Sequence, residues 1–204
     1  MTAQNLIRWS GPITILAGIL YIIGAILHPS GEDLTAILEP FWVPSHQIYW
    51  VSLVLLMFGL VGINLRLADR TGWLLKTAFI LAFIGTSLTV CIVLLSATVA
   101  PIVAEQTPDI LEQVLTFPPY LLMVFLLGFG LGYILLGIVI FRGDALPRWS
   151  GVLLIFGVIL FIVAEMELFD PQSSHFSVTL GDTLFGLGLL WIGFSLWQEK
   201  NPFS

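Results

Sequence analysis

Charged side chains are scarce in this chain of 204 residues. Asp, Glu, Lys and Arg make up 10% of the sequence, hydrophobic residues make up 58%, and the mean hydropathy is +1.02. A soluble domain carries about 25% charged residues, and a soluble domain of this length lacks the interior to bury so much apolar surface. The composition therefore predicts an all-α, polytopic membrane protein.

Two further scarcities exclude whole classes of function. Cys91 is the only cysteine, which excludes a disulfide framework and a CxxC redox or zinc site. The seven Lys and Arg residues form no basic patch, which excludes nucleic acid as a partner. The chain also lacks G-x-S-x-G, HExxH, P-loop and G-x-G-x-x-G sequences, so no familiar catalytic motif is present.

Six apolar stretches are long enough to cross a bilayer, which takes about 20 residues. They cover residues 11–27, 46–65, 73–99, 119–141, 149–167 and 177–197. The segments between them contain the Pro, Gly and charged residues that end helices. We therefore expect one integral membrane domain over residues 1–204, built as a bundle of six transmembrane helices.

The positive charges all lie on one side of this predicted bundle. Every Lys and Arg falls at the amino terminus, in the second or fourth loop, or at the carboxyl terminus. By the positive-inside rule, we expect a multi-pass cell-membrane protein with both termini cytoplasmic and its acidic loops outside. The tryptophans fit aromatic belts at the two interfaces: Trp9, Trp73, Trp149 and Trp197 at the inner one, and Trp42 and Trp50 at the outer one.

Two short elements recur along the chain. RWSG occurs at Arg8–Gly11 and again at Arg148–Gly151, with a fainter copy at Arg70–Trp73, and Phe-Gly-Leu begins at Phe58, Phe129 and Phe185. The recurrence predicts three parallel helix hairpins, at residues 8–66, 70–142 and 148–197. In RWSG we expect Arg and Trp to anchor the chain at the membrane surface and Ser-Gly to begin a helix as its N-cap. We expect the glycines of Phe-Gly-Leu to let neighbouring helices approach closely.

Polar residues collect at the expected outer end. Glu165 lies about 24 Å along its helix, inside the outer edge of a hydrocarbon core about 30 Å thick. Asp182, about two turns into the last helix, reaches a similar depth, and the first loop brings His28 and His46 to the same side. Two carboxylates at one level of the bilayer are costly unless they are paired, protonated, hydrated or bound to a cation.

A divalent transition metal suits this set of residues. The candidate ligands are His28, His46, Glu165, Glu167 and Asp182, with Glu32 and His175 nearby. Imidazole and carboxylate ligands bind zinc, nickel, iron or copper, and the sequence leaves open whether a haem or pigment is bound. A simpler interpretation stays open: the helix dipole favours a histidine at the carboxyl end of a helix, and the two glutamates reach interfacial water.

The middle of the predicted spans contains no Asp, Glu, His, Lys or Arg. Ion pathways and proton relays use such residues. The sequence therefore favours a bundle that binds an apolar ligand or serves as an accessory or assembly subunit of a membrane complex, with the lipid bilayer and other membrane subunits as partners. Two alternatives remain: a permease for divalent metal cations, and a membrane enzyme that uses the outer histidines and carboxylates.

Overall fold

The computed structural model describes residues 2–31, 33–68, 72–111, 113, 119–165 and 171–198. The regular elements in these residues are all helical, which confirms the predicted all-α class. They are α1 (Ala3–Leu27), α2 (Leu34–Ile37), α3 (Trp42–Leu67), α4 (Gly72–Gln106), η1 (Pro108–Ile110), α6 (Pro119–Phe125), η2 (Leu126–Leu131), α7 (Gly132–Arg142), α8 (Arg148–Glu165) and α9 (Pro171–Trp197). Five helices are long and apolar enough to cross a membrane: Ala3–Leu27, Trp42–Leu67, Gly72–Gln106, Met123–Arg142 and His175–Trp197. The stretch Arg148–Ala164 of α8 is apolar but shorter.

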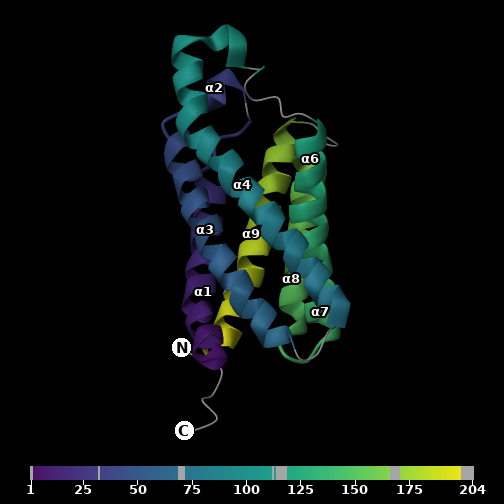
Figure 1. Ribbon diagram of the computed structural model, residues 1–204. Coiled ribbons are helices and arrows are strands. Elements are labelled where there is room, and N and C mark those ends of the chain that lie inside the picture. The colour runs from purple at the N-terminus through teal and green to yellow at the C-terminus, as the bar shows by residue number, and fades with distance from the viewer. Residues whose placement is uncertain are drawn as a thin grey trace.

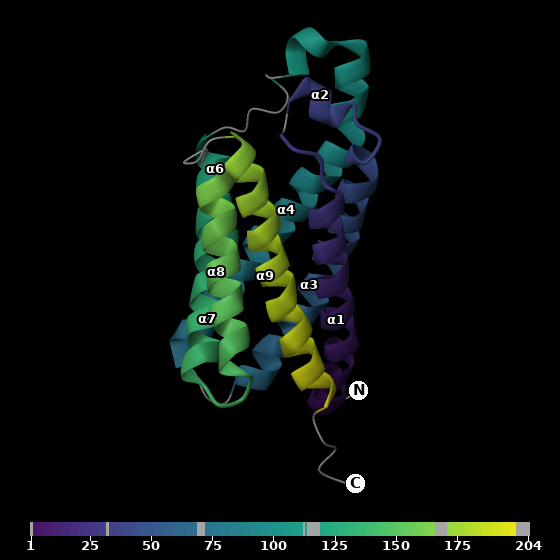
Figure 2. The same ribbon diagram turned by 180° about the vertical axis from the view of Figure 1, so that it is seen from behind.

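The long helices form a closed ring. Helix α1 packs between α3 and α9, α8 packs between α9 and α7, and α4 completes the ring by contacting α3 on one side and η2 and α7 on the other. Figure 1 shows that α1 begins and α9 ends at the same end of the bundle. The other end carries α2 and the last turns of α4, which rise beyond the neighbouring helices (Figure 2). We call these the lower and upper ends.

Helix α1 begins eight residues before the predicted span, so the predicted role of Ser10 as an N-cap is wrong. The N-cap is Thr2, whose side-chain oxygen accepts a hydrogen bond from the Asn5 amide at 3.3 Å. Ser10 instead lies inside the helix and donates to the carbonyl oxygen of Ile7 at 2.6 Å. In the second copy, Ser150 makes the matching bond to the carbonyl oxygen of Pro147, also at 2.6 Å.

The small residues of RWSG mark places where helices touch. A Cβ atom added to Gly11 would lie 2.8 Å from the carbonyl oxygen of Gly193 in α9, and one added to Gly137 in α7 would lie 2.6 Å from that of Gly151. The serine next to Gly11 lies at the other interface of α1, because Ser10 fills the space beside Gly62 of α3. Ser and Gly therefore allow close helix contact here, which is how small residues act at helix interfaces in membranes.

Helix η2 is a π-helical turn between α6 and α7. It places Gly128 directly against Gly85 of α4, where an added Cβ atom would lie 2.7 Å from the Gly85 Cα atom. It also turns Phe129 into the core, leaving that side chain 2% exposed. A π-turn widens the helix locally, and here it brings two backbones together across the bundle.

Side chains fill the centre of the ring. Tyr133 and Leu189 are fully buried, Phe129 and Phe185 are 2% exposed, and Tyr21 is 5% exposed. The aromatic rings in this group are in contact: the centroids are 5.1 Å apart for Tyr21 and Phe185, and 4.9 Å apart for Tyr133 and Phe185. The hydroxyl groups of Thr86 and Tyr133 lie 2.7 Å apart, which satisfies the buried phenol. The interior is therefore a packed core of aromatic and leucine side chains.

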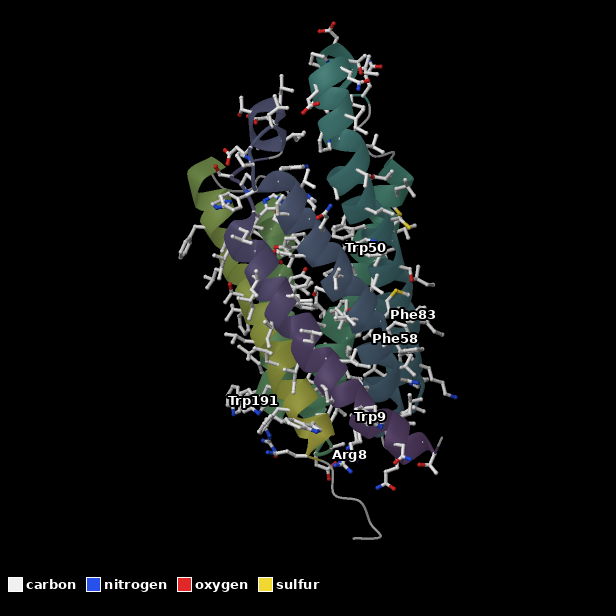
Figure 3. All side chains as sticks on the ribbon, turned by 90° about the vertical axis from the view of Figure 1, so that its left-hand side faces the viewer. Arg8, Trp9, Trp50, Phe58, Phe83 and Trp191 are labelled. Atoms are coloured by element: carbon white, nitrogen blue, oxygen red, sulfur yellow. The ribbon has the colours of Figure 1, made fainter. Side chains whose placement is uncertain are left out.

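The tryptophans near the lower end fit the predicted belt. Trp9, Trp73, Trp149 and Trp197 are between 50% and 75% exposed. Figure 3 shows Arg8 and Trp9 near the lower end, with Trp50 in the upper half of the molecule. Trp42, by contrast, is completely buried, so the prediction that it lies in an interfacial belt is wrong.

Candidate functional site

The upper ends of α1, α3 and α9 bring several polar side chains together. His28 directly follows α1, His46 and Tyr49 belong to the first two turns of α3, and Asp182 comes from α9. The rings of His28 and His46 have centroids 4.8 Å apart, and His28 and Tyr49 have centroids 6.2 Å apart. The hydroxyl group of Tyr49 donates a hydrogen bond to Oδ2 of Asp182. We call these four residues the His-Tyr-Asp cluster.

His46 is oriented by its own helix. Its side chain is 5% exposed, and its Nδ1 atom lies 2.9 Å from the carbonyl oxygen of Trp42, one turn earlier. A carbonyl oxygen can only accept, so Nδ1 carries the proton and Nε2 is the acceptor atom of the neutral ring. The local helical fold thus fixes both the tautomer and the direction of the imidazole.

Trp42 packs against both histidines, with its ring centroid 5.4 Å from that of His28. The rings of Trp42 and His46 have centroids 4.2 Å apart and are tilted by 35°. The indole Nε1–H donates to the carbonyl oxygen of Ser96 at 2.9 Å, which ties the start of α3 to α4. Trp42 also belongs to a small upper core with Ala36, Ile37, Ala100, Ala104 and Leu111. The cluster is therefore held between the main bundle and this second core.

His28 is held by the turn that ends α1. Its Nδ1 atom donates to the carbonyl oxygen of Pro29 at 2.7 Å. Burial lowers the pKa of His28 below its ordinary value of 6.5, and the nearby His175 lowers it further, although the bond to Pro29 acts in the opposite direction. His28 is therefore neutral at pH 7, because a base with a lowered pKa releases its proton more readily.

Asp182 is a buried residue of α9. Helix α9 begins at Pro171, six residues before the predicted span, and Asp182 lies about two turns after His175, where the apolar span of this helix begins. The preceding Gly181 packs against Gly157, halfway along α8. Asp182 is 2% exposed. A buried carboxylate needs a partner, and Tyr49 provides one.

The predicted metal ligands have different outcomes. The structure places His28 and His46 side by side and links Asp182 to them through Tyr49. The side chain of Glu165 and all of Glu167 lie outside the described residues, as does Glu32. Among the residues that are described, no three His, Cys, Asp or Glu side chains come close enough to hold a metal ion together. The five-residue site stays a prediction.

Sequence reasoning missed Trp42 and Tyr49 as members of this site. Both were detectable in principle, because they flank His46 at spacings of four and three residues and so share its helix face. Comparison with models of protein families, with curated proteins and with solved structures finds no match to this chain. Its function must therefore be argued from its own residues.

Proposed function

We propose that the chain crosses the membrane six times, with both termini in the cytoplasm. Helix α8 is the sixth span, because its apolar stretch Arg148–Ala164 extends about 25 Å and nearly matches a hydrocarbon core of about 30 Å. The described cationic residues support the orientation. They lie at the lower ends of their helices, at Arg8, Arg66, Lys76, Arg142 and Arg148, and the positive-inside rule assigns that end to the cytoplasm.

Equivalent contacts support the hairpin repeat. In η2 and α7, Gly130 and Gly137 face α8, whereas Gly132 faces α4 of its own hairpin. In α9, the matching residues Gly186 and Gly193 face α1, whereas Gly188 faces α8 of its own hairpin. The second helices of the second and third hairpins therefore use matching glycines toward the next hairpin and toward their own partner, whereas Gly59 of α3 in the first hairpin faces Thr14 of its own partner α1. The match between the second and third hairpins supports a repeat about an axis along the membrane normal.

In function, the protein is a binding or accessory subunit that acts through its extracytoplasmic end and does not conduct ions. The packed interior is the observation that carries this proposal. Among the described residues, Tyr133, Phe185 and Leu189 fill the centre of the ring with packed side chains. Transport sites near the midplane are built from polar groups lining a cavity, and aromatic packing offers neither.

The packed interior also bears on the other functions considered. It argues against a cation permease, and it leaves little space for an apolar ligand inside the bundle. The polar groups that remain for a ligand are gathered at the upper end of α1, α3 and α9. The membrane-enzyme alternative uses the same residues, but it needs a substrate-binding cavity that none of the contacts described above supplies.

One observation favours a role in assembly with another membrane protein. Helix α4 is the least buried of the five long apolar helices. Of the residues in its most apolar stretch, 22% are buried, compared with 39–50% in the other four helices. Helix α4 exposes Ile80, Ile84, Leu94 and Leu95. Lipid tails satisfy such a face, and so does a partner helix, because association in membranes depends on packing rather than on hydrophobicity.

Metal uptake into proteoliposomes tests the proposed function. We expect vesicles containing the purified protein to take up Zn²⁺, Ni²⁺ and Co²⁺ no faster than protein-free vesicles, because the interior is closed. An entrapped metal-sensitive dye reports the flux, and an added ionophore shows that the dye responds. Saturable uptake of any of these ions that depends on the protein would contradict the proposal.

A further inference from the structure

His28 and His46 are arranged as pairs of metal-binding imidazoles are. Each ring donates its Nδ1–H to a backbone carbonyl oxygen, of Pro29 in one case and of Trp42 in the other. Imidazoles that bind metals usually make such a bond through the ring nitrogen that does not touch the metal, which fixes the tautomer and the ring direction. Two histidines separated by 18 positions in the sequence are thus anchored to the backbone through the same ring nitrogen.

The distance between the rings fits a shared ion. A zinc ion lies about 2.0–2.1 Å from an imidazole nitrogen, and hence about 3.2 Å from the ring centroid. Two imidazoles on one tetrahedral ion therefore have centroids about 5 Å apart. The observed separation of 4.8 Å agrees with this value, and the 51° tilt between the rings excludes a parallel stack as the reason for their proximity.

A pair of imidazoles suits a cation that binds nitrogen. Imidazole selects zinc, copper or nickel over the harder magnesium and calcium ions, which prefer oxygen ligands. Among the described residues, no third His, Cys, Asp or Glu lies within reach of the pair, so the proposal is confined to the two histidines.

We propose that His28 and His46 bind one divalent transition-metal ion at the extracytoplasmic end of α1 and α3. This metal site would be the ligand-binding site of the proposed function. It rests on that function in one respect, the assignment of the upper end to the outside of the cell. Tyr49 and Asp182 lie behind this pair: the Tyr49 ring contacts His28, and its hydroxyl group is bonded to Asp182. They position His28 without binding the ion.

Zinc binding to the full-length protein in mild detergent tests the proposal. After treatment with a chelator and dialysis, we expect elemental analysis and calorimetry to show one Zn²⁺ per chain and no binding of Mg²⁺. His28→Ala and His46→Ala should each weaken zinc binding at least about tenfold. Asp109→Asn is the control, because it changes an exposed side chain of η1 at the same end of the molecule and should leave zinc binding unchanged.

The experiment distinguishes a variant that does not fold from a variant that folds but does not bind zinc. His28→Gln and His46→Gln keep a polar side chain of similar size, and circular dichroism with size-exclusion chromatography identifies variants that fold. Wild-type protein that binds no zinc would overturn the proposal, as would folded variants of both histidines that bind it as tightly as the wild type. The zinc-binding experiment can fail while the uptake experiment still shows no flux. The failure of this proposal is therefore distinguishable from the failure of the proposed function.

Discussion

Gly85→Leu should abolish folding or lower the free energy of unfolding by about 3 kcal/mol or more, above the usual range for overpacking. A Cβ atom at Gly85 would collide with the backbone of Gly128 and Phe129 in η2. A backbone cannot move aside as the end of a flexible side chain can. The helices would have to separate, which would also displace Phe129 from the core. Denaturation in mild detergent, followed by circular dichroism, measures the effect.

Cys91→Leu is the matched control, because it adds a larger side chain to the same helix at an exposed position. We expect it to change stability by no more than about 0.5 kcal/mol. Equal stability of the two variants would show that α4 and η2 do not make the close contact described above. The result would also remove the main argument for the π-helical turn, since its role here is to bring Gly128 to Gly85.

Asp182→Ala should lower the free energy of unfolding by about 1–3 kcal/mol, the cost of leaving a buried hydrogen-bonding group without its partner. Tyr49 donates its hydroxyl hydrogen to Asp182 in a buried environment, and alanine provides no acceptor. Asp182→Asn retains a side-chain carbonyl oxygen of the same reach and should lose much less stability. The comparison separates the need for an acceptor from the need for a side chain of that volume.

A double-mutant cycle with Tyr49→Phe completes this experiment. If the hydrogen bond is the main contribution, the two substitutions should be less damaging together than the sum of their separate effects, with a coupling of about 0.5–3 kcal/mol. Strict additivity would mean that Tyr49 and Asp182 act independently. Equal damage from Asp182→Asn and Asp182→Ala would also contradict the proposed hydrogen bond, because the amide oxygen can accept it.

Composition and apolar run lengths were sufficient to predict the helical class, because membranes admit few alternatives to helices. Helix ends were harder to predict. Helix α4 continues to Gln106, beyond the predicted end at residue 99, because its last turns pack against α2 in the upper core. A single sequence does not reveal such tertiary support. Helix α9 likewise begins six residues before its predicted span.

The role of small residues also depended on tertiary contacts. Ser10 looks like a helix cap when only its neighbours in sequence are considered, yet Thr2 caps the helix and Ser10 packs against Gly62. Trp42 looks like a belt residue near a predicted helix end, yet α2 and α4 cover it completely. The proximity of His28 and His46 was predictable for a simpler reason: a short loop joins the two helix ends that carry them.

Labelling from the two sides of the membrane tests most directly the central claim, that the His-Tyr-Asp cluster lies at the extracytoplasmic end. Cys91→Ser provides a background without cysteine, into which Ser30→Cys, beside His28, or Asp144→Cys, between α7 and α8, is introduced singly; both positions are exposed. A membrane-impermeant maleimide added to intact cells should label the cysteine at position 30 and should label that at position 144 only after permeabilisation. The reverse pattern would place the cluster in the cytoplasm and contradict this account.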